Sequence, residues 1–232
     1  MSMKNSSELV KTGIPGLDKL LGGGLPPGSI TLVSGPTGSG RSTLALQFLV
    51  KGAKLYSEPG LYVVIEESRE STYRHMDYKG WDLAGLENSK QLIFLDYPPY
   101  EVDQFLSQRS AVGEIIDTMG VERLVIDSIM PIALLFPDQD ARKKGFLEVI
   151  QNLRKWKTTT LIVAEEEPAA EGERPRTPYG IENLVDGWIR LDYVYAKEKR
   201  QRRIEVVKMK GRTHLMQRFP VEIGESGISV EV

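Results

Sequence analysis

The 232-residue chain contains no cysteine and only two histidines, His75 and His214. The lack of cysteine excludes disulfide bonds, thiolate metal sites and thiol nucleophiles, and two histidines are too few for a histidine-rich metal centre. Long apolar runs are also missing, because the longest one, at residues 129–136, is too short to cross a bilayer. The first residues, MSMKNSSEL, lack the apolar stretch of a signal peptide. We therefore expect a cytoplasmic protein with no membrane partner.

An excess of charge of one sign is absent as well. The 30 lysine and arginine residues nearly balance the 32 aspartate and glutamate residues and leave a net charge of −2. No overall field therefore favours nucleic acid or an anionic membrane as a partner. No linker rich in proline, serine and glycine divides the chain, and its length suits one large α/β domain. We expect a single domain over residues 1–232, with a lead-in at 1–29 and a β-rich extension at 187–232.

The most informative stretch is ITLVSGPTGSGRST at residues 30–43, where an apolar run gives way to glycines and then to helix-forming residues. This order predicts a strand, a loop and the start of a helix. Within it, GPTGSGRS differs from the phosphate-binding pattern G-x-x-x-x-G-K-[ST] only in having Arg41 where the lysine should be. The residues expected to bind a nucleotide here are Gly35, Pro36, Thr37, Gly38, Ser39, Gly40, Arg41, Ser42 and Thr43.

The chemistry of triphosphate binding explains these residue types. Glycines let backbone N–H groups approach the phosphates closely, and the following helix directs its N-terminal N–H groups and the positive end of its dipole at them. Ser42 offers a hydroxyl to Mg²⁺, and Thr43 is placed to contact an α-phosphate. An ordinary glycine-rich turn is the alternative interpretation, but the full spacing between a strand and a helix favours a phosphate loop.

Short apolar runs alternate with helical patterns through the middle of the chain. Helices are expected at residues 17–21, 44–53, 102–119 and 145–156. Strands are expected in the apolar run that begins at residue 30 and at residues 61–65, 91–95, 123–126 and 160–164. This alternation predicts an α/β fold with a mostly parallel central sheet and helices on both faces.

The pattern changes in the last third of the chain. Residues 165–180 show no periodicity, and we expect a mobile loop at the carboxyl edge of the sheet. Further on, only β patterns appear, which predicts a C-terminal antiparallel β extension. Its strands are expected at residues 188–195, 203–209, 218–223 and 228–230.

Acidic residues stand at the ends of two expected strands. Glu66 and Glu67 follow one of them, and Asp127 closes another. In an open α/β sheet the ligand lies beyond the carboxyl ends of the strands, so these carboxylates should approach the phosphate loop. Asp127 suits a role in holding Mg²⁺ through water, and Glu66 or Glu67 could deprotonate an attacking water. The alternatives are a helix N-cap for Asp127 and acidic residues that favour a helix N-terminus for the two glutamates.

A basic run occupies residues 197–203. Charges at a hairpin tip keep strand edges apart, so a solvated turn is the simpler interpretation, and contact with DNA is the alternative. Trp188, Tyr193 and Tyr195 on the preceding strand favour packing on the sheet over a platform for stacked bases. His214 is expected in a surface loop.

The order of these motifs resembles the KaiC family of RecA-like ATPases over nearly the whole chain. The matching segments are the lead-in GIPGLDKLLGGGLPPGS, the phosphate loop SGPTGSGRST, the acidic pair in YVVIEES, the Walker B strand LVIDS and the late segment VVKMKGRTH. The resemblance implies a RecA-like P-loop NTPase core, ATP and Mg²⁺ as cofactors, and a ring-shaped homo-oligomer that is typically a hexamer.

The same resemblance assigns roles to individual residues. It implies that Glu66 is the catalytic base with Glu67 beside it, and that Lys208 and Lys210 face the γ-phosphate bound to an adjacent subunit. Two positions depart from the family pattern, because Arg41 replaces the P-loop lysine and Lys210 replaces an arginine. Both departures keep the positive charge and change its geometry.

Three functions are consistent with these observations. The leading hypothesis is an ATPase that hydrolyses ATP slowly within a ring, with Arg41 acting at the phosphates. A nucleotide-dependent regulatory or scaffold protein with little turnover is the second, and it would engage an unidentified protein partner. A recombinase-like DNA-binding protein is the third, and binding to single-stranded DNA that weakens with salt would distinguish it.

Overall fold

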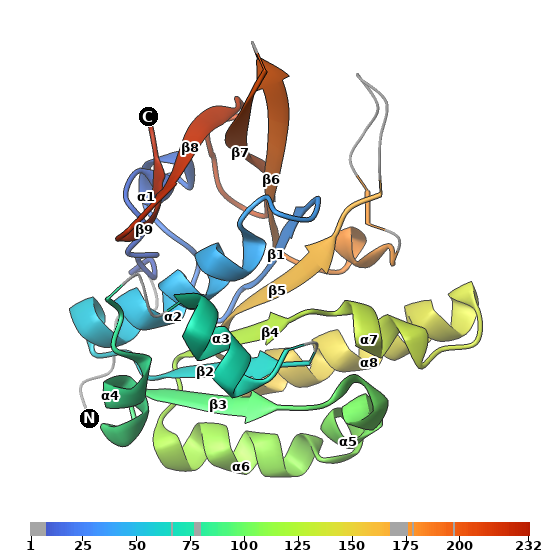
Figure 1. Ribbon diagram of the computed structural model, residues 1–232. Helices are drawn as coiled ribbons and strands as arrows, with labels where there is room; N and C mark the ends of the chain where they lie inside the picture. Colours follow the sequence, from blue (N-terminus) through green and yellow to red (C-terminus); the bar gives the residue numbers. More distant parts are fainter. Residues whose placement is uncertain (1–7, 66, 77–79, 168–175, 178, 197) are drawn as a thin grey trace.

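The computed structural model describes residues 8–65, 67–76, 80–167, 176–177, 179–196 and 198–232 (Figure 1). Within these ranges, nine strands form one sheet in the order β3-β2-β4-β5-β1-β6-β7-β8-β9. The first six strands in this order are parallel, and β7, β8 and β9 are added antiparallel. The strands are β1 (Ile30–Gly35), β2 (Gly60–Val64), β3 (Leu92–Asp96), β4 (Arg123–Asp127), β5 (Thr159–Glu165), β6 (Gly187–Ala196), β7 (Lys199–Met209), β8 (Phe219–Gly224) and β9 (Gly227–Val230).

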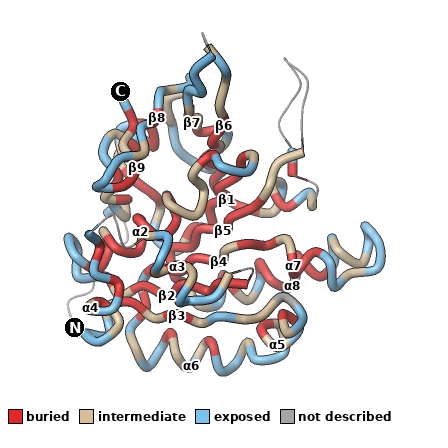
Figure 2. The backbone as a smooth tube through the Cα atoms, viewed as in Figure 1, coloured by how far each residue is buried: buried red, intermediate tan, exposed pale blue. Residues whose placement is uncertain are grey.

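Helices cover both faces of the parallel part of the sheet. One apolar cluster packs α2 and α4 on the first face, and a second cluster packs α5 to α8 on the opposite face. The buried strands run between the two clusters (Figure 2). The helices are α1 (Leu17–Leu20), α2 (Arg41–Tyr56), α3 (Arg69–Met76), α4 (Leu83–Asn88), α5 (Val102–Ser107), α6 (Arg109–Met119), α7 (Met130–Leu134) and α8 (Gln139–Trp156), with 3-10 turns η2 (Pro99–Glu101) and η3 (Ile181–Asn183).

This architecture confirms the predicted fold class. The strands β1, β2 and β5 are buried along their whole length or nearly so, because both of their faces are covered. None of the helices in the described ranges combines the length and apolar character that crossing a bilayer requires. The segment predicted as a mobile loop, residues 165–180, lies largely outside the described residues. Among its described residues, Glu167 N donates a hydrogen bond to Arg176 O at 3.1 Å.

The antiparallel extension begins one strand later than the sequence predicts. β6 pairs in parallel with β1, with Thr31 opposite Gly187, so it belongs to the parallel part of the sheet. Asp186, just before β6, accepts a hydrogen bond from Ile30 N at 3.1 Å and thereby fixes the register of the two strands. The sequence pattern of β6 could not reveal its neighbour, because pairing partners come from distant parts of the chain.

Two predicted helices have different bounds in the structure. The continuous helix expected at 102–119 is divided at Gln108 into α5 and α6, and no proline or glycine marks the break. The helix expected from residue 145 begins instead at Gln139, because the Asp138 side chain caps it by accepting a hydrogen bond from Ala141 N at 2.8 Å. Gly145 therefore lies inside α8, and glycine is required there because a Cβ would stand 2.0 Å from the Phe136 ring.

The prediction of a basic hairpin turn is also corrected. The strand β7 begins at Lys199, which pairs with Ala196 at the end of β6, so most of the basic run lies in a strand and not in a turn. Lys199, Arg200, Arg202 and Arg203 therefore belong to β7 and point to alternate sides of the sheet. This placement brings two of these arginines to the phosphate loop, as described below.

Candidate nucleotide-binding site

The phosphate loop connects the carboxyl end of β1 to the first turn of α2, as the sequence predicts. Gly35 to Gly40 form the loop, and Arg41, Ser42 and Thr43 begin the helix, with Thr37 and Gly38 exposed at the tip. Gly38 has φ +78°, a left-handed conformation that side chains disfavour. At Gly35 a Cβ would stand 2.2 Å from Leu191 O of the neighbouring β6. The loop therefore requires glycine both for its shape and for its close packing.

Arg41 occupies the position of the P-loop lysine, and its side chain is 13% exposed. Its Nη2 lies 3.6 Å from Glu165 Oε1 at the end of β5, whereas its Nη1 is buried and has no hydrogen-bond partner in the described part of the chain. The buried Ser39 hydroxyl in the same loop also lacks a partner there. A buried donor without an acceptor costs about 1–3 kcal/mol. Two such donors in a phosphate loop fit an anionic ligand that supplies the missing acceptors.

Asp127 lies at the end of β4, within reach of the first turn of α2. Tyr62 Oη donates a hydrogen bond to Asp127 Oδ2 at 2.6 Å, and Ser42 lies near the same carboxylate. Burial raises the pKa of Asp127, and the interactions with Tyr62 and Ser42 oppose that increase. The structure thus brings together the two residues that the sequence assigned to a metal.

Ser42 and Asp127 fit Mg²⁺ in the manner of P-loop proteins. Both offer oxygen atoms, which this hard cation prefers, and the rest of its coordination normally comes from phosphate oxygens and water. No group of three or more acidic, histidine or cysteine side chains in the described ranges could hold a metal by itself. A magnesium ion at this site would therefore be bound jointly by Ser42, water held by Asp127 and the nucleotide.

The acidic pair is only partly described. Glu66 lies outside the described residues. Glu67 accepts a hydrogen bond from Ser71 Oγ at 2.6 Å and lies 2.6 Å from His75 Nδ1, so its carboxylate is held against helix α3. Ile65 N donates to Asp127 O at 2.9 Å, which brings the chain beside Asp127 immediately before Glu66.

Lys208 and Lys210 do not approach the phosphate loop of their own chain. They lie near the end of β7, which runs antiparallel to β6, and therefore at the amino edge of the parallel strands. Lys208 Nζ donates to Glu182 O at 2.9 Å and to Val185 O at 2.8 Å, and burial lowers its pKa. Lys210 Nζ lies 3.5 Å from Asp186 Oδ1. An ammonium has three donors, so Lys208 keeps one for another acceptor.

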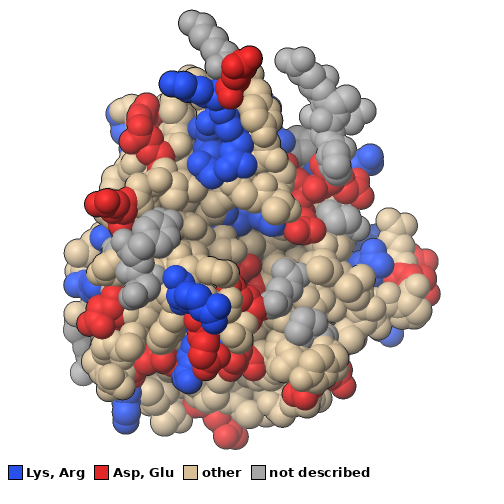
Figure 3. Space-filling model, in the orientation of Figure 1, with Lys and Arg blue, Asp and Glu red and all other residues tan. Residues whose placement is uncertain are grey.

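Two arginines on β7 lie beside the loop, and the sequence patterns did not predict this position for them. Arg202 Nε donates to Gly38 O at 3.2 Å, and Arg200 Nη1 lies 3.4 Å from the position of a Cβ on Gly38. Arg200 also stands over the Tyr193 ring, at 5.1 Å from its centre. Lys and Arg side chains gather over the β6–β7 hairpin in Figure 3. The excess of positive charge in residues 197–203 indicated an anionic contact, but the sequence could not show that the phosphate loop lies beside it.

A network of partly buried charges supports the strand that leads into the loop. Ser34 Oγ donates to Glu166 Oε1 at 2.7 Å and accepts from Trp188 Nε1 at 2.6 Å. Arg190 Nε binds Glu166 at 2.8 and 2.9 Å, and its Nη1 lies 3.0 Å from Glu205 Oε1. This network joins the ends of β1 and β5 to β6 and β7, and it explains Trp188 as a buried packing residue.

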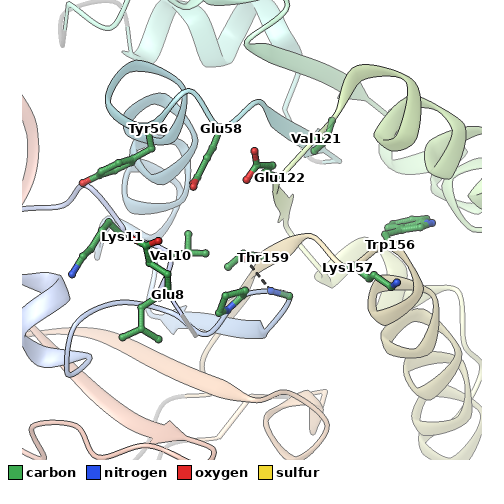
Figure 4. Close-up of a pocket in the computed structure, with 13 residues that line it drawn as sticks. Glu8, Val10, Lys11, Tyr56, Glu58, Val121, Glu122, Trp156, Lys157 and Thr159 are labelled. Carbon is green, nitrogen blue, oxygen red and sulfur yellow. Dashed lines mark hydrogen bonds between the residues drawn. The ribbon is translucent and has the colours of Figure 1, made fainter. Parts of the chain in front are cut away.

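Two cavities lie in different positions relative to the loop. One of about 660 Å³ is lined by the arginines of β7 and by residues of β8, including Ile223, whose side chain packs against Gly40. The other, of about 600 Å³, is lined by residues that include Tyr56, Glu122 and Trp156 (Figure 4). Gly28 and Thr159 also line it, and Gly28 N donates a hydrogen bond to Thr159 Oγ1. Since Thr159 begins β5, this second cavity lies at the amino edge of the sheet, away from the phosphate loop.

The parallel sheet, the glycine loop at a helix N-terminus and the Ser42–Asp127 pair together define a P-loop NTPase of RecA-like architecture. The family model for the KaiC ATPase matches residues 10–232. The chain therefore belongs to the KaiC ATPase family.

Individual relatives agree with this assignment. The chain is 30% identical over 234 residues to the circadian clock oscillator protein KaiC of Nostoc sp. (strain PCC 7120), which covers 97% of this chain and 44% of that protein. It thus spans less than half the length of the KaiC proteins that it matches. It is 33% identical to UPF0273 protein MJ1359 of Methanocaldococcus jannaschii, with 95% of each chain covered. The crystal structure of KaiC-like protein PH0186 from Pyrococcus horikoshii matches with a TM-score of 0.85 and 35% identity, over 97% of this chain and 99% of that one.

Proposed function

We propose that this protein binds ATP with Mg²⁺ at the loop of residues 35–43 and hydrolyses it slowly within a ring of identical subunits. The observation that carries the proposal is the buried Nη1 of Arg41, which has no partner in the described residues although it lies at the start of α2. A phosphate oxygen would supply the acceptor that this nitrogen lacks. Helix α2 adds backbone N–H donors and positive potential at the same point.

Slow hydrolysis follows from the side chain at position 41. A lysine ammonium is a compact charge on a flexible stem, whereas guanidinium is a broad planar fork. Arg41 is also restrained on one side by Glu165 at 3.6 Å. Ground-state attraction to phosphates survives these differences, but a misplacement of about 1 Å in a catalytic group can reduce the rate on the order of a hundredfold.

Glu66 is the proposed base that activates the attacking water. The family resemblance assigns it this role, and the contacts of its neighbour support the choice. Glu67 is already held by Ser71 and His75 and is thereby less available to accept a proton. Lys208 and Lys210 would reach the γ-phosphate bound to an adjacent subunit, because they lie at the opposite edge of the sheet from their own loop.

A regulatory protein that binds nucleotide with negligible turnover is the second candidate, and the Arg41–Glu165 contact favours it. Such a protein would change its assembly or its protein partners with nucleotide and would not require an effective base at Glu66. A DNA-binding function receives less support, since Arg202, within the basic run, donates to Gly38 of the phosphate loop.

The proposal is tested in two steps. Thermal unfolding with and without MgATP reports binding, and about 2.7 kcal/mol of stabilisation is expected at a ligand concentration one hundred times Kd. Steady-state ATPase rates of the native protein, Arg41→Lys and Glu66→Gln then report catalysis. We expect Arg41→Lys to be faster than the native protein and Glu66→Gln to be inactive while binding equally well.

Each outcome separates the candidates. Equal melting temperatures at saturating MgATP would refute nucleotide binding altogether. Binding without turnover in both the native protein and Arg41→Lys would favour the regulatory function. A native rate that matches Arg41→Lys would show that an arginine P-loop is fully competent.

A further inference from the structure

The hydroxyl of Tyr62 donates a hydrogen bond to Asp127, the aspartate expected to hold Mg²⁺, although the sequence patterns assign this tyrosine no role. Tyr62 lies on β2, is 2% exposed, and donates to Asp127 Oδ2 at 2.6 Å. The neighbouring strand β4 carries Asp127, and Val64 stands opposite it in the ladder. The Tyr62 side chain therefore reaches along the sheet toward its carboxyl edge, where the nucleotide site lies.

The ring of Tyr62 is the first of three aromatic rings that pack against one another in a column, followed by Phe94 and Tyr73. Tyr62 and Phe94 meet edge to face with centroids 5.4 Å apart, and Phe94 and Tyr73 do the same at 5.2 Å. Tyr73, on α3, donates its own hydroxyl to Glu87 on α4. Because rings packed in this way have little rotational freedom, the Tyr62 hydroxyl has a defined position.

A donor in a fixed position on one oxygen of a carboxylate restricts the orientation of the whole group. Because Tyr62 holds Oδ2 of Asp127, the carboxylate cannot rotate freely, and Oδ1 points in one fixed direction. Ser42, in the first turn of α2, lies near this carboxylate as well. Groups that hydrogen-bond to a carboxylate near a metal orient it and tune its affinity for the ion.

We propose that Tyr62 is a positioning residue that orients Asp127 toward the Mg²⁺ of the bound nucleotide. The inference rests on the proposed function, since it requires MgATP at the loop. Tyr62 itself touches neither the nucleotide nor the ion. Removing its hydroxyl should weaken the contribution of Mg²⁺ to nucleotide binding and leave the metal-free contribution of the loop unchanged.

The test compares Tyr62→Phe with Tyr73→Phe, which removes a hydroxyl from the same column at a site bonded to Glu87. Binding of a fluorescent ATP analogue is measured first in EDTA and then during titration with Mg²⁺, without reference to turnover. For Tyr62→Phe we expect unchanged affinity in EDTA and a half-saturating Mg²⁺ concentration raised about tenfold. For Tyr73→Phe both quantities should match the native protein.

The outcomes distinguish this inference from the proposed function. If the native protein binds the analogue with a clear Mg²⁺ dependence that Tyr62→Phe shares, the positioning role is wrong and the proposed function stands. If Tyr73→Phe shifts the Mg²⁺ midpoint as much as Tyr62→Phe, the effect comes from general loosening of the column and the inference fails. If the native protein does not bind the analogue at all, both proposals fall.

Discussion

Replacing Arg123 tests how the amino edge of this sheet is held together. In the described part of the chain, Arg123 is the largest fully buried side chain. Its Nε donates to Glu58 Oε2 at 2.7 Å, its Nη1 to Phe48 O at 2.8 Å and its Nη2 to Lys11 O at 2.7 Å. A Cβ on Gly52 would stand 2.4 Å from the Arg123 side chain, so α2 makes room for the guanidinium.

The expected cost of Arg123→Ala follows from these contacts. Removing one partner of a buried ion pair typically costs about 3–5 kcal/mol, because the remaining charge loses its compensation. Glu58 is 8% exposed, so water would not readily replace the arginine. We take the loss in unfolding free energy as about 4 kcal/mol. Each kcal/mol lowers the melting temperature of a chain of this size by about 2–4 °C, so the melting temperature should fall by about 8–16 °C.

The assay is thermal unfolding followed by far-UV circular dichroism, with two comparison variants. Arg123→Lys keeps the charge but cannot donate to three separated acceptors in a fork, so an intermediate loss is expected. Arg176→Ala removes an exposed ion pair with Glu167, at 2.8 Å, and should cost less than about 1 kcal/mol. If Arg123→Ala melted within a few degrees of Arg176→Ala, the reasoning from burial would be refuted.

Two further predictions concern assembly and pH. Light scattering of the native protein with nucleotide should show an oligomer whose ATPase activity falls in Lys208→Ala, and a strict monomer at micromolar concentration with unaffected activity would contradict the ring. Burial alone raises the pKa of Asp186, but hydrogen bonds from Arg154 and Ile30 N outweigh it and hold the pKa below its usual value. Such a carboxylate stabilises the fold above its unfolded pKa and loses that effect as pH falls through the folded pKa. The native protein should therefore melt above Asp186→Asn at neutral pH, and this difference should shrink below about pH 4; a difference independent of pH would contradict the assignment.

The sequence determined the features that depend on neighbouring residues. The phosphate loop could be predicted because its strand, glycines and helix start are consecutive, and Asp127 because it closes an apolar run. The α/β class followed from the alternation of strand and helix patterns. The position of Gly145 inside α8 shows the limit of this reasoning, since its reason lies in the Phe136 ring and not in the helix itself.

Contacts between groups that are distant in the sequence could be identified only from the folded chain. Arg202 and Gly38 are 164 positions apart, and Tyr62 and Asp127 are 65 apart. Their contacts depend on strand order and register, which are set by the packing of the whole sheet. Local patterns describe what a residue is suited to do, but a hydrogen bond needs two groups within about 3 Å, and folding alone brings such groups together.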